Sequence, residues 1–284
     1  MAQIAFLGTG LLGSAFAEAA AKRGDVVTAW NRSANKVEAL AAFGVKAAAT
    51  PADAVRDATR VHLVLKDDAV VEEVIAAARP GLADGAVVID HSTTLPALTV
   101  QRAARLHDAG VKYLHCPVFM APAAARNAQG TMLVSGPGAL YDIVKDELAK
   151  MTRRVKYLGE RQDLAAANKL LGNALIIGLV AVMADVLTLA QASDIGSMDA
   201  IALLKLLDLN GMVDGRGTNM AKGNFTPSFE LAMARKDVAL MLELAGNRPL
   251  AALPGVQARM DALIAKGHGA DDVCMLGIDT VRRD

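Results

Sequence analysis

Short apolar stretches alternate with amphipathic stretches along roughly the first 160 residues of this chain of 284 residues. The apolar stretches have the length of buried strands, and the segments between them have the length and composition of helices. This alternation predicts a Rossmann-type α/β fold with a parallel, doubly wound sheet. The expected strands are residues 2–8, 26–30, 45–49, 60–65, 86–90, 111–118, 131–136 and 154–159. The expected helices are residues 14–23, 51–57, 69–78, 96–109 and 138–151, and residues 119–130 are expected to form a loop.

The most apolar stretch of the chain follows at residues 163–192. It has no proline and consists of strong helix formers, so it predicts one helix much longer than the average of about 11–12 residues. Polar residues interrupt it at Asn173, Asp185 and Gln191, so it lacks the clean apolar run of about 20 residues that a transmembrane helix needs. We therefore expect no membrane association.

Beyond this helix the strand pattern stops, and the rest of the chain is predicted to be all helical. Breaks are expected at 211–217, 227, 249–254 and 267–269, where glycine and proline gather. We expect a first domain at 1–160 and an all-α second domain at 161–284, which begins with the interdomain helix 163–192.

Composition excludes several classes of protein. Thirty basic and thirty acidic residues give zero net charge, which argues against a nucleic-acid partner. Cys116 and Cys274 lack metal-site spacing, so we expect no metal and two reduced thiols in a cytoplasmic protein. The N-terminal residues lack the basic region of a signal peptide.

A glycine motif joins the first expected strand to the first expected helix. It consists of Gly8, Thr9, Gly10, Leu11, Leu12 and Gly13, with the spacing G-x-G-x-x-G. In dinucleotide-binding sites the first glycine allows a tight turn, the second lets the backbone approach a pyrophosphate, and the third brings helix and strand together. The helix N-terminus then offers free N–H groups to the phosphates. We expect a dinucleotide site here.

The end of the second strand indicates which dinucleotide is bound. An NAD site usually has an acidic residue there to hold the ribose 2′-hydroxyl. This chain instead has Asn31, Arg32 and Ser33, with Lys36 one turn further. A guanidinium and a hydroxyl suit a 2′-phosphate, so we expect NADP(H) to be preferred, with NAD(H) possible. A solvated basic turn is the alternative interpretation.

Two further turns are expected to line the same cleft, because ligands of doubly wound sheets lie at the carboxyl ends of the strands. The turn after the strand 60–65 contributes Leu65 and Lys66, and the turn after Asp90 contributes Thr93. The Thr93 hydroxyl could equally satisfy backbone donors at the start of the next helix.

Lys169 and Asn173 stand near the start of the long apolar helix. Because they are four residues apart, they share one face of the helix. Reduction of a carbonyl needs a proton at oxygen, and an ammonium in an apolar cleft can deliver it, since desolvation lowers the pKa of lysine. The residues alone leave open that the lysine extends to water and the asparagine bonds to a neighbouring helix.

Several motifs, in order, resemble those of the β-hydroxyacid dehydrogenase family, the group of 3-hydroxyisobutyrate dehydrogenase, with 6-phosphogluconate dehydrogenase and imine reductases as wider relatives. They are FLGTGLLG, DHSTT, CPV, QGTMLVSG, NKLLGN and ARKDVAL, and they extend over essentially the whole chain. The resemblance implies a Rossmann-type domain and a helical domain joined by a long helix, in dimers or tetramers that share helices. It implies that Lys169, in a K-x-x-x-N pattern with Asn173, moves the proton while the nicotinamide moves a hydride. It also implies that Thr93 and Lys236 contact the cofactor, although Lys236 also fits an ordinary solvated face.

The expected substrate loop departs from the family pattern D-A-P-V-S-G-G, in which a serine and glycine amides hold a carboxylate. Here Phe119 replaces the serine, Met120 replaces the first glycine, and Ala121 follows. These side chains make the loop narrower and less polar, which favours a bulkier, less polar substrate or an anion site made of backbone amides alone.

We therefore expect an NADPH-dependent oxidoreductase that acts on a small aldehyde, ketone or hydroxy acid, with Lys169 as proton donor and acceptor. An imine reductase is one alternative; the apolar loop favours it and Lys169 opposes it. A non-catalytic NADPH-binding protein is another. The apolar helix predicts a homodimer or homotetramer, because one subunit of this size has difficulty covering so much apolar surface.

Overall fold

The computed structural model describes residues 3–281. Contacts within the chain group the residues up to Asn173 into one compact unit and those from Ala174 onward into a second. The division falls inside helix α8 (Leu164–Ala192), the long apolar helix, and not near residue 160 where the strand pattern ends.

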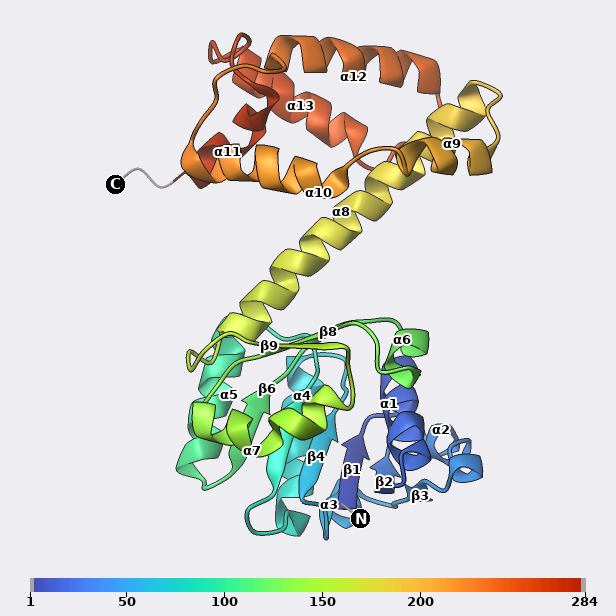
Figure 1. Ribbon diagram of the computed structural model, residues 1–284, viewed down its shortest axis with the longest axis vertical. Coiled ribbons are helices and arrows are strands. Elements are labelled where there is room, and N and C mark those ends of the chain that lie inside the picture. The colour runs from blue at the N-terminus through green and yellow to red at the C-terminus, as the bar shows by residue number, and fades with distance from the viewer. Residues whose placement is uncertain (1–2, 282–284) are drawn as a thin grey trace. The chain divides into compact units, whose positions relative to one another are not determined.

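The first unit is built on a parallel sheet whose strand order is β3-β2-β1-β4-β5-β6 (Figure 1). The order turns in both directions from β1, which makes β1 and β4 the neighbours at the switch point of a doubly wound fold. The Rossmann-type sheet expected from the sequence is thus confirmed. Its strands are β1 (Gln3–Leu7), β2 (Val26–Trp30), β3 (Lys46–Ala47), β4 (Arg60–Leu63), β5 (Val87–Asp90) and β6 (Lys112–His115).

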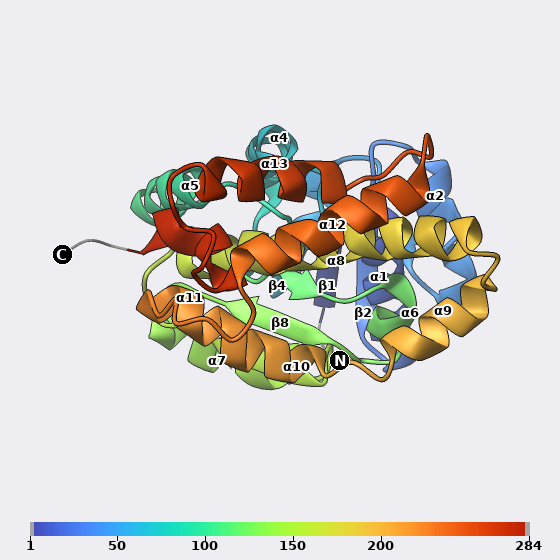
Figure 2. The ribbon, with the colours of Figure 1, turned by 90° about the horizontal axis from the view of Figure 1, so that it is seen from above.

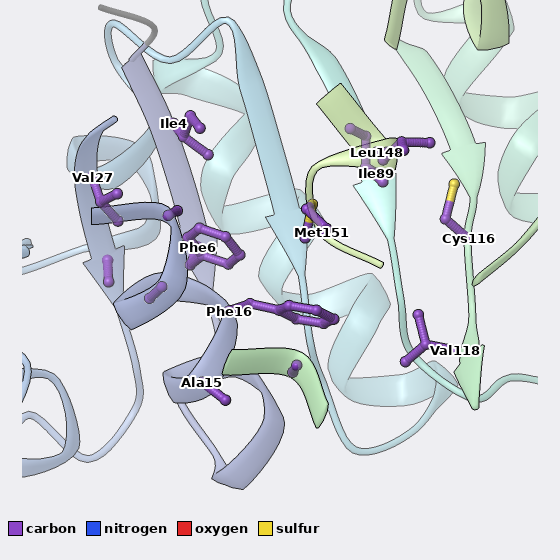
Figure 3. Packing of buried hydrophobic residues seen from close by; sticks show 14 of the residues in the cluster. Ile4, Phe6, Ala15, Phe16, Val27, Ile89, Cys116, Val118, Leu148 and Met151 are labelled. Carbon is purple, nitrogen blue, oxygen red and sulfur yellow. The ribbon is translucent and has the colours of Figure 1, made fainter. Parts of the chain in front are cut away.

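Helices cover both faces of this sheet. They are α1 (Leu11–Lys22), α2 (Asn35–Glu38), α3 (Pro51–Val55), α4 (Asp68–Ala78), α5 (Pro96–Asp108) and α7 (Gly138–Ala149). Successive residues of a strand point to opposite faces, so each buried strand supplies two cores. Phe6 lies next to Phe16 of α1, as Figure 3 shows, and Ile4 belongs to the same core, whereas Leu7 packs on the other face with α3 and α4.

A second, small sheet follows the first and was not distinguished by the sequence pattern. It has the order β7-β8-β9, with β7 (Val118–Phe119) antiparallel to β8 (Thr131–Val134) and β9 (Arg154–Tyr157) parallel to it. The expected strand 111–118 is therefore two strands, because Cys116 and Pro117 separate β6 from β7. The expected loop 119–130 contains the short helix α6 (Pro122–Arg126), which packs on α1.

The second unit is all helical over its described residues, as expected. After α8 it contains α9 (Ser197–Leu204), α10 (Leu209–Met212), α11 (Thr218–Lys222), α12 (Leu231–Ala245) and α13 (Leu253–Ile264), followed by a 3₁₀ segment, η4 (Val273–Thr280). Helices α12 and α13 lie side by side and form the core of the unit with η4 (Figure 2).

One expected break in this unit is wrong. The glycines at 211–217 do not end the helix, because the π-helical turn Val213–Gly217 joins α10 to α11 without interruption. The expected breaks at 227, 249–254 and 267–269 do fall at helix ends, and Pro254 occupies the first turn of α13, where a missing N–H costs nothing.

Asp185 in the middle of α8 is buried, and its carboxylate connects two elements of the second unit. It accepts hydrogen bonds from the backbone N–H groups of Ala251 (2.5 Å), Ala252 (2.9 Å) and Leu253 (2.9 Å). These groups open α13, so the carboxylate satisfies donors that the helix leaves without partners and complements the positive end of its dipole.

Candidate active site

The glycine turn after β1 has the geometry that its spacing predicts. Gly8 has φ +98°, and a Cβ at this position would overlap with the carbonyl of Val64, the residue that follows β4. A Cβ on Gly13 would overlap with the carbonyl of Gly8, so only glycine lets α1 approach the turn so closely. A Cβ on Gly10, in contrast, would meet no atom within 4 Å. Gly10 therefore faces open space, as an approach path for a phosphate requires.

The N-terminus of α1 opens toward this space with the features of an anion site. Gly10 is its N-cap and supplies no side-chain oxygen, so the first N–H groups of the helix are not capped by a side chain. The first turn also carries no acidic residue. Free N–H groups and the positive end of the helix dipole together favour a bound phosphate.

A cleft of about 460 Å³ lies over this helix end. It is lined by most of the residues that the sequence assigned to a cofactor. They are Gly8, Gly10, Leu11, Leu12, Gly13, Asn31, Arg32, Ser33, Lys36, Leu65, Lys66 and Thr93. The structure thus brings together four turns that are far apart in sequence, at the carboxyl ends of β1, β2, β4 and β5.

Two of the expected cofactor residues are not among the residues that line this cleft. Thr9 is buried beneath the turn; its N–H donates to Oδ1 of Asn31 (3.0 Å), and its carbonyl accepts from the Ser14 hydroxyl (2.9 Å). Lys236 belongs to the second unit, on α12, where it is exposed and forms an ion pair with Asp237 (3.0 Å). Its assignment to the cofactor stays a prediction.

The residues at the basic edge of the cleft have two different roles: one is structural, and the others offer hydrogen-bond donors to a ligand. The Asn31 side chain accepts from Thr9 and donates to the carbonyl of Ser33 (3.1 Å), so it holds the glycine turn to the end of β2. Arg32 and Lys36 are exposed on the cleft wall, and neither forms an ion pair with any residue between 3 and 281. These two cations and the Ser33 hydroxyl match the donor set of a 2′-phosphate.

Sequence reasoning missed several residues of this cleft, above all His91 and Ser92. The Ser92 hydroxyl accepts a hydrogen bond from the N–H of Leu65 (3.0 Å) and so joins the turns after β4 and β5. Below it, the buried Asp90 carboxylate accepts from the N–H of Ser92 (2.9 Å) and the hydroxyl of Tyr113 (2.8 Å). The remaining lining residues that were not expected are Trp30, Val64, Val70, Glu73 and Val74.

His91 connects the cleft to the segment between β6 and β7, which leads into the expected substrate loop. Its Nδ1 lies 2.7 Å from the carbonyl of Cys116, and its Nε2 lies 2.9 Å from Nδ1 of His62. Burial lowers the pKa of His91 to about 4, so the ring is neutral near pH 7. A carbonyl can only accept, so His91 donates from Nδ1 and accepts at Nε2. Hydrogen bonds from His62 to His91 and from His91 to the Cys116 carbonyl therefore hold the turn after β5 in place.

Two residues beyond Cys116, the carbonyl of Val118 holds Lys169. The half-buried Lys169 Nζ donates to this carbonyl at 2.7 Å and to Oδ1 of Asn173 at 3.0 Å. Both expected catalytic residues thus converge, as their four-residue spacing on α8 predicts. Burial lowers the pKa of Lys169, and no carboxylate within residues 3–281 forms an ion pair with it to oppose this effect.

Phe119, the residue in place of the family's serine, packs directly on α8. Its ring centroid lies 4.3 Å from the Lys169 ammonium, at the distance of a cation–π contact. A Cβ on Gly172 would overlap with the same ring, so the ring lies against the bare helix backbone at this glycine. Met120 is partly buried next to it and Ala121 is exposed. Among residues 3–281, no group of three histidine, cysteine or acidic side chains could hold a metal ion.

Comparison with known proteins places this geometry in a family. The family model for the NAD binding domain of 6-phosphogluconate dehydrogenase matches residues 3–159, the segment that contains the glycine turn and the cleft. The chain belongs to this family. It is therefore an NAD(P)-dependent oxidoreductase of the β-hydroxyacid dehydrogenase type, as the motifs indicated.

Known proteins are similar to this chain over most of its length. Glyoxylate/succinic semialdehyde reductase 1 from Arabidopsis thaliana is 27% identical over 267 residues, which are 92% of this chain and 91% of that protein. Among solved structures, an imine reductase from Myxococcus stipitatus in complex with NADP⁺ superposes with a TM-score of 0.88 at 22% identity, covering 96% of this chain and 98% of that one. A reductive aminase from Aspergillus terreus, in complex with NADPH and ethyl levulinate, gives a TM-score of 0.89 at 24% identity, covering 99% and 100%. These two structures confirm the fold.

Proposed function

We propose that this oxidoreductase is an NADPH-dependent reductase of small carbonyl compounds in which Lys169 delivers the proton. The observation that carries the proposal is the position of Lys169 Nζ between Val118 O and Asn173 Oδ1, with no carboxylate to neutralise it among the described residues. The Arabidopsis relative described above is named for the reduction of glyoxylate and succinic semialdehyde, which are both small aldehydes.

The cleft over α1 fits a dinucleotide with a 2′-phosphate. Gly10 and the first N–H groups of α1 would hold the pyrophosphate, and Arg32, Ser33 and Lys36 would hold the 2′-phosphate. Glu73 is the one carboxylate among the residues that line the cleft. It follows that NADPH is the expected cofactor and that NADH binds more weakly.

The chemistry divides between cofactor and protein. When bound, the nicotinamide ring supplies the hydride to the carbonyl carbon. The carbonyl oxygen, as it gains negative charge, takes a proton from the Lys169 ammonium and becomes a hydroxyl. Lys169 is left as a neutral amine, which takes a proton from water before the next turnover. In the reverse direction the neutral amine accepts the hydroxyl proton of the alcohol.

Two neighbours fit Lys169 for this role. An ammonium has three N–H donors, and the acceptors Val118 O and Asn173 Oδ1 occupy two of them. One donor thus remains for a substrate oxygen. Because burial lowers the pKa of Lys169, its ammonium gives up the proton more readily than that of a solvated lysine.

Replacement of this lysine tests the proposal. Lys169→Ala should lower the turnover of NADPH-dependent carbonyl reduction by about 10²–10⁴-fold, because a proton donor is lost. NADPH affinity should stay nearly unchanged, because the cofactor cleft is lined by other residues. The measurement is NADPH oxidation at saturating carbonyl, together with a fluorescence titration of NADPH. Lys46→Ala, at an exposed position on β3, is the matched control and should behave as wild type.

Two outcomes of this experiment would contradict the proposal. Wild-type turnover in Lys169→Ala would remove the lysine from the chemistry. NADPH binding without turnover of any aldehyde, ketone, hydroxy acid or imine by the wild type would instead support a non-catalytic NADPH-binding protein.

An imine reductase is the second candidate function, and the Phe119 ring beside the site favours it. Its reacting species is a cationic iminium, which an aromatic face attracts. However, the Lys169 ammonium already lies over this face, and like charges repel. Turnover of cyclic imines without turnover of any carbonyl compound would reverse the ranking.

We further propose that the protein acts in the cytoplasm as a homodimer or homotetramer, without nucleic acid or membrane. Zero net charge supports the absence of a nucleic-acid partner. Helix α8 is long and apolar enough to cross a membrane by length and composition, with a mean hydropathy of 2.2. The buried Asp185 in its middle, bonded to the start of α13, supports a second protein subunit rather than lipid as its cover.

A further inference from the structure

Phe119 and Gly172 form a complementary pair at the expected substrate loop. Gly172 lies in the interior of a helix of 29 residues, where glycine costs about 1 kcal/mol relative to alanine. The space that it leaves is filled by the Phe119 ring, which any larger residue at this position would displace. The pair therefore fixes the ring in one place beside Lys169, since residues three apart share a helix face.

The backbone of the expected substrate loop is also held in place at this point. Val118 and Phe119 form strand β7 and pair with Met132 and Thr131 of β8. In addition, the carbonyl of Val118 accepts a hydrogen bond from the Lys169 ammonium. This stretch is therefore a paired strand and not an open turn with free backbone amides. A cradle of backbone N–H groups for a carboxylate, which the sequence left open, has no support at these two residues.

The ring also has the wrong electrostatics for an anion. The face of an aromatic ring is negative, which suits the Lys169 ammonium above it and disfavours a carboxylate. Burial of a carboxylate without hydrogen-bond donors is costly. If a substrate carboxylate paired with Lys169, it would also occupy the proton donor that the carbonyl oxygen needs.

From this arrangement we infer that Phe119, which packs on Gly172, selects substrates in which the chain attached to the reacting carbonyl carries no charge. The protein thus reduces neutral aldehydes and ketones, including esters of oxo acids, in preference to the oxo acids themselves. This inference rests on the function proposed above, and it names the substrate class of the same site.

A pair of substrates that differ mainly in charge tests the selection. Succinic semialdehyde carries a carboxylate, and its methyl ester has the same chain with that charge removed. Wild type should reduce the ester with a kcat/KM at least about tenfold higher than that of the acid, which corresponds to about 1.4 kcal/mol. Phe119→Ser, which restores a hydroxyl donor, should lower this ratio to near one or below.

Two further variants separate the position of the ring from its mere presence. Phe119→Leu keeps the site apolar and should keep the preference for the ester. Gly172→Ala displaces the ring from α8 and should lower the ratio of ester to acid, with folding checked by circular dichroism and by NADPH titration. Wild type and all variants are measured as the full chain at saturating NADPH.

The outcomes distinguish this inference from the proposed function. Reduction of both substrates with the acid preferred by wild type, or a ratio that Phe119→Ser leaves unchanged, would overturn the selection and leave Lys169 chemistry intact. No reduction of either substrate, or of any other carbonyl compound, would overturn the proposed function and this inference with it.

Discussion

Neighbouring residues at the end of β2 have different tasks, although the sequence assigns them one role. The Asn31 side chain forms hydrogen bonds with Thr9 and Ser33 and stabilises the glycine turn. Arg32 is exposed on the cleft wall and forms no ion pair within residues 3–281. Discrimination between NADPH and NADH should therefore rest on Arg32, with help from Lys36, and the integrity of the turn on Asn31.

Arg32→Ala should weaken NADPH binding by about tenfold or more, because a charge-assisted hydrogen bond to phosphate contributes roughly 1.5–3 kcal/mol. NADH, which lacks the 2′-phosphate, should lose much less affinity. Fluorescence titration of both cofactors measures the two dissociation constants, with Lys46→Ala as a control for a lost surface charge. Equal losses for both cofactors would show that Arg32 does not contact the phosphate.

The sequence predicts the cleft well because the position of a turn in a parallel sheet follows from the strand that precedes it. Turns at the carboxyl ends of parallel strands meet at one edge, so Arg32, Leu65 and Thr93 could be assigned from strand ends alone. His91 was missed, although it stands in the predicted turn, because its role depends on Cys116 and His62 across the sheet. The contact of Phe119 with Gly172 could likewise not be predicted from the sequence, since no local pattern connects residues 53 positions apart.

At the scale of elements, the clearest gap between pattern and structure is Asp185. In the sequence it only interrupts an apolar stretch, whereas in the structure its carboxylate caps α13. The π-helical turn Val213–Gly217 is a similar case, because glycines that usually end a helix here continue one. Both features depend on partners outside the local sequence, which a helix pattern does not encode.

Asp185→Ala should destabilise the protein by about 3 kcal/mol or more, because it leaves three N–H groups at the start of α13 without an acceptor. Denaturant unfolding at pH 7 measures this loss. Glu243→Ala, at an exposed position on α12, is the control and should change stability by less than about 0.5 kcal/mol. A loss for Asp185→Ala as small as that of the control would contradict the capping role.

The same variant has a defined pH dependence. Burial raises the pKa of Asp185, but the hydrogen bonds from Ala251, Leu253 and Ala252 outweigh it and hold the pKa below its ordinary value. A carboxyl whose pKa is lower in the folded state contributes its full stabilisation above the unfolded pKa, about 3.9 for aspartate. The difference between wild type and Asp185→Ala should therefore shrink as the pH falls below about 4.

At the scale of the whole molecule, exposed apolar side chains are concentrated on α8 and on the second unit. On α8 they include Leu171, Leu175, Ile176, Ile177 and Val180, with exposures of 50–68%. Patches of this kind mark interaction surfaces in soluble proteins. The pattern was predictable from the uniform apolarity of residues 163–192, but which surface covers it was not, because a sequence does not show its own partner.

We expect this surface to bind a second copy of the chain. Light scattering after size exclusion at micromolar concentration should give a multiple of the subunit mass of 29.5 kDa, a dimer or a tetramer. Ile177→Asp, which places a charge on α8, should shift the protein toward the monomer. A wild-type mass of 29.5 kDa, or recovery only with detergent and lipid, would contradict the assignment.

The pH dependence of carbonyl reduction by wild type and Lys169→Ala tests the central assignment most directly. A proton donor must be protonated to act, so the wild-type kcat/KM with NADPH should be highest at low pH and fall as the pH rises through the pKa of Lys169. Burial sets that pKa below the ordinary value of 10.5. Lys169→Ala should be about 10²–10⁴-fold slower and should lack this decline. A Lys169→Ala variant with the rate and pH profile of wild type would contradict the account.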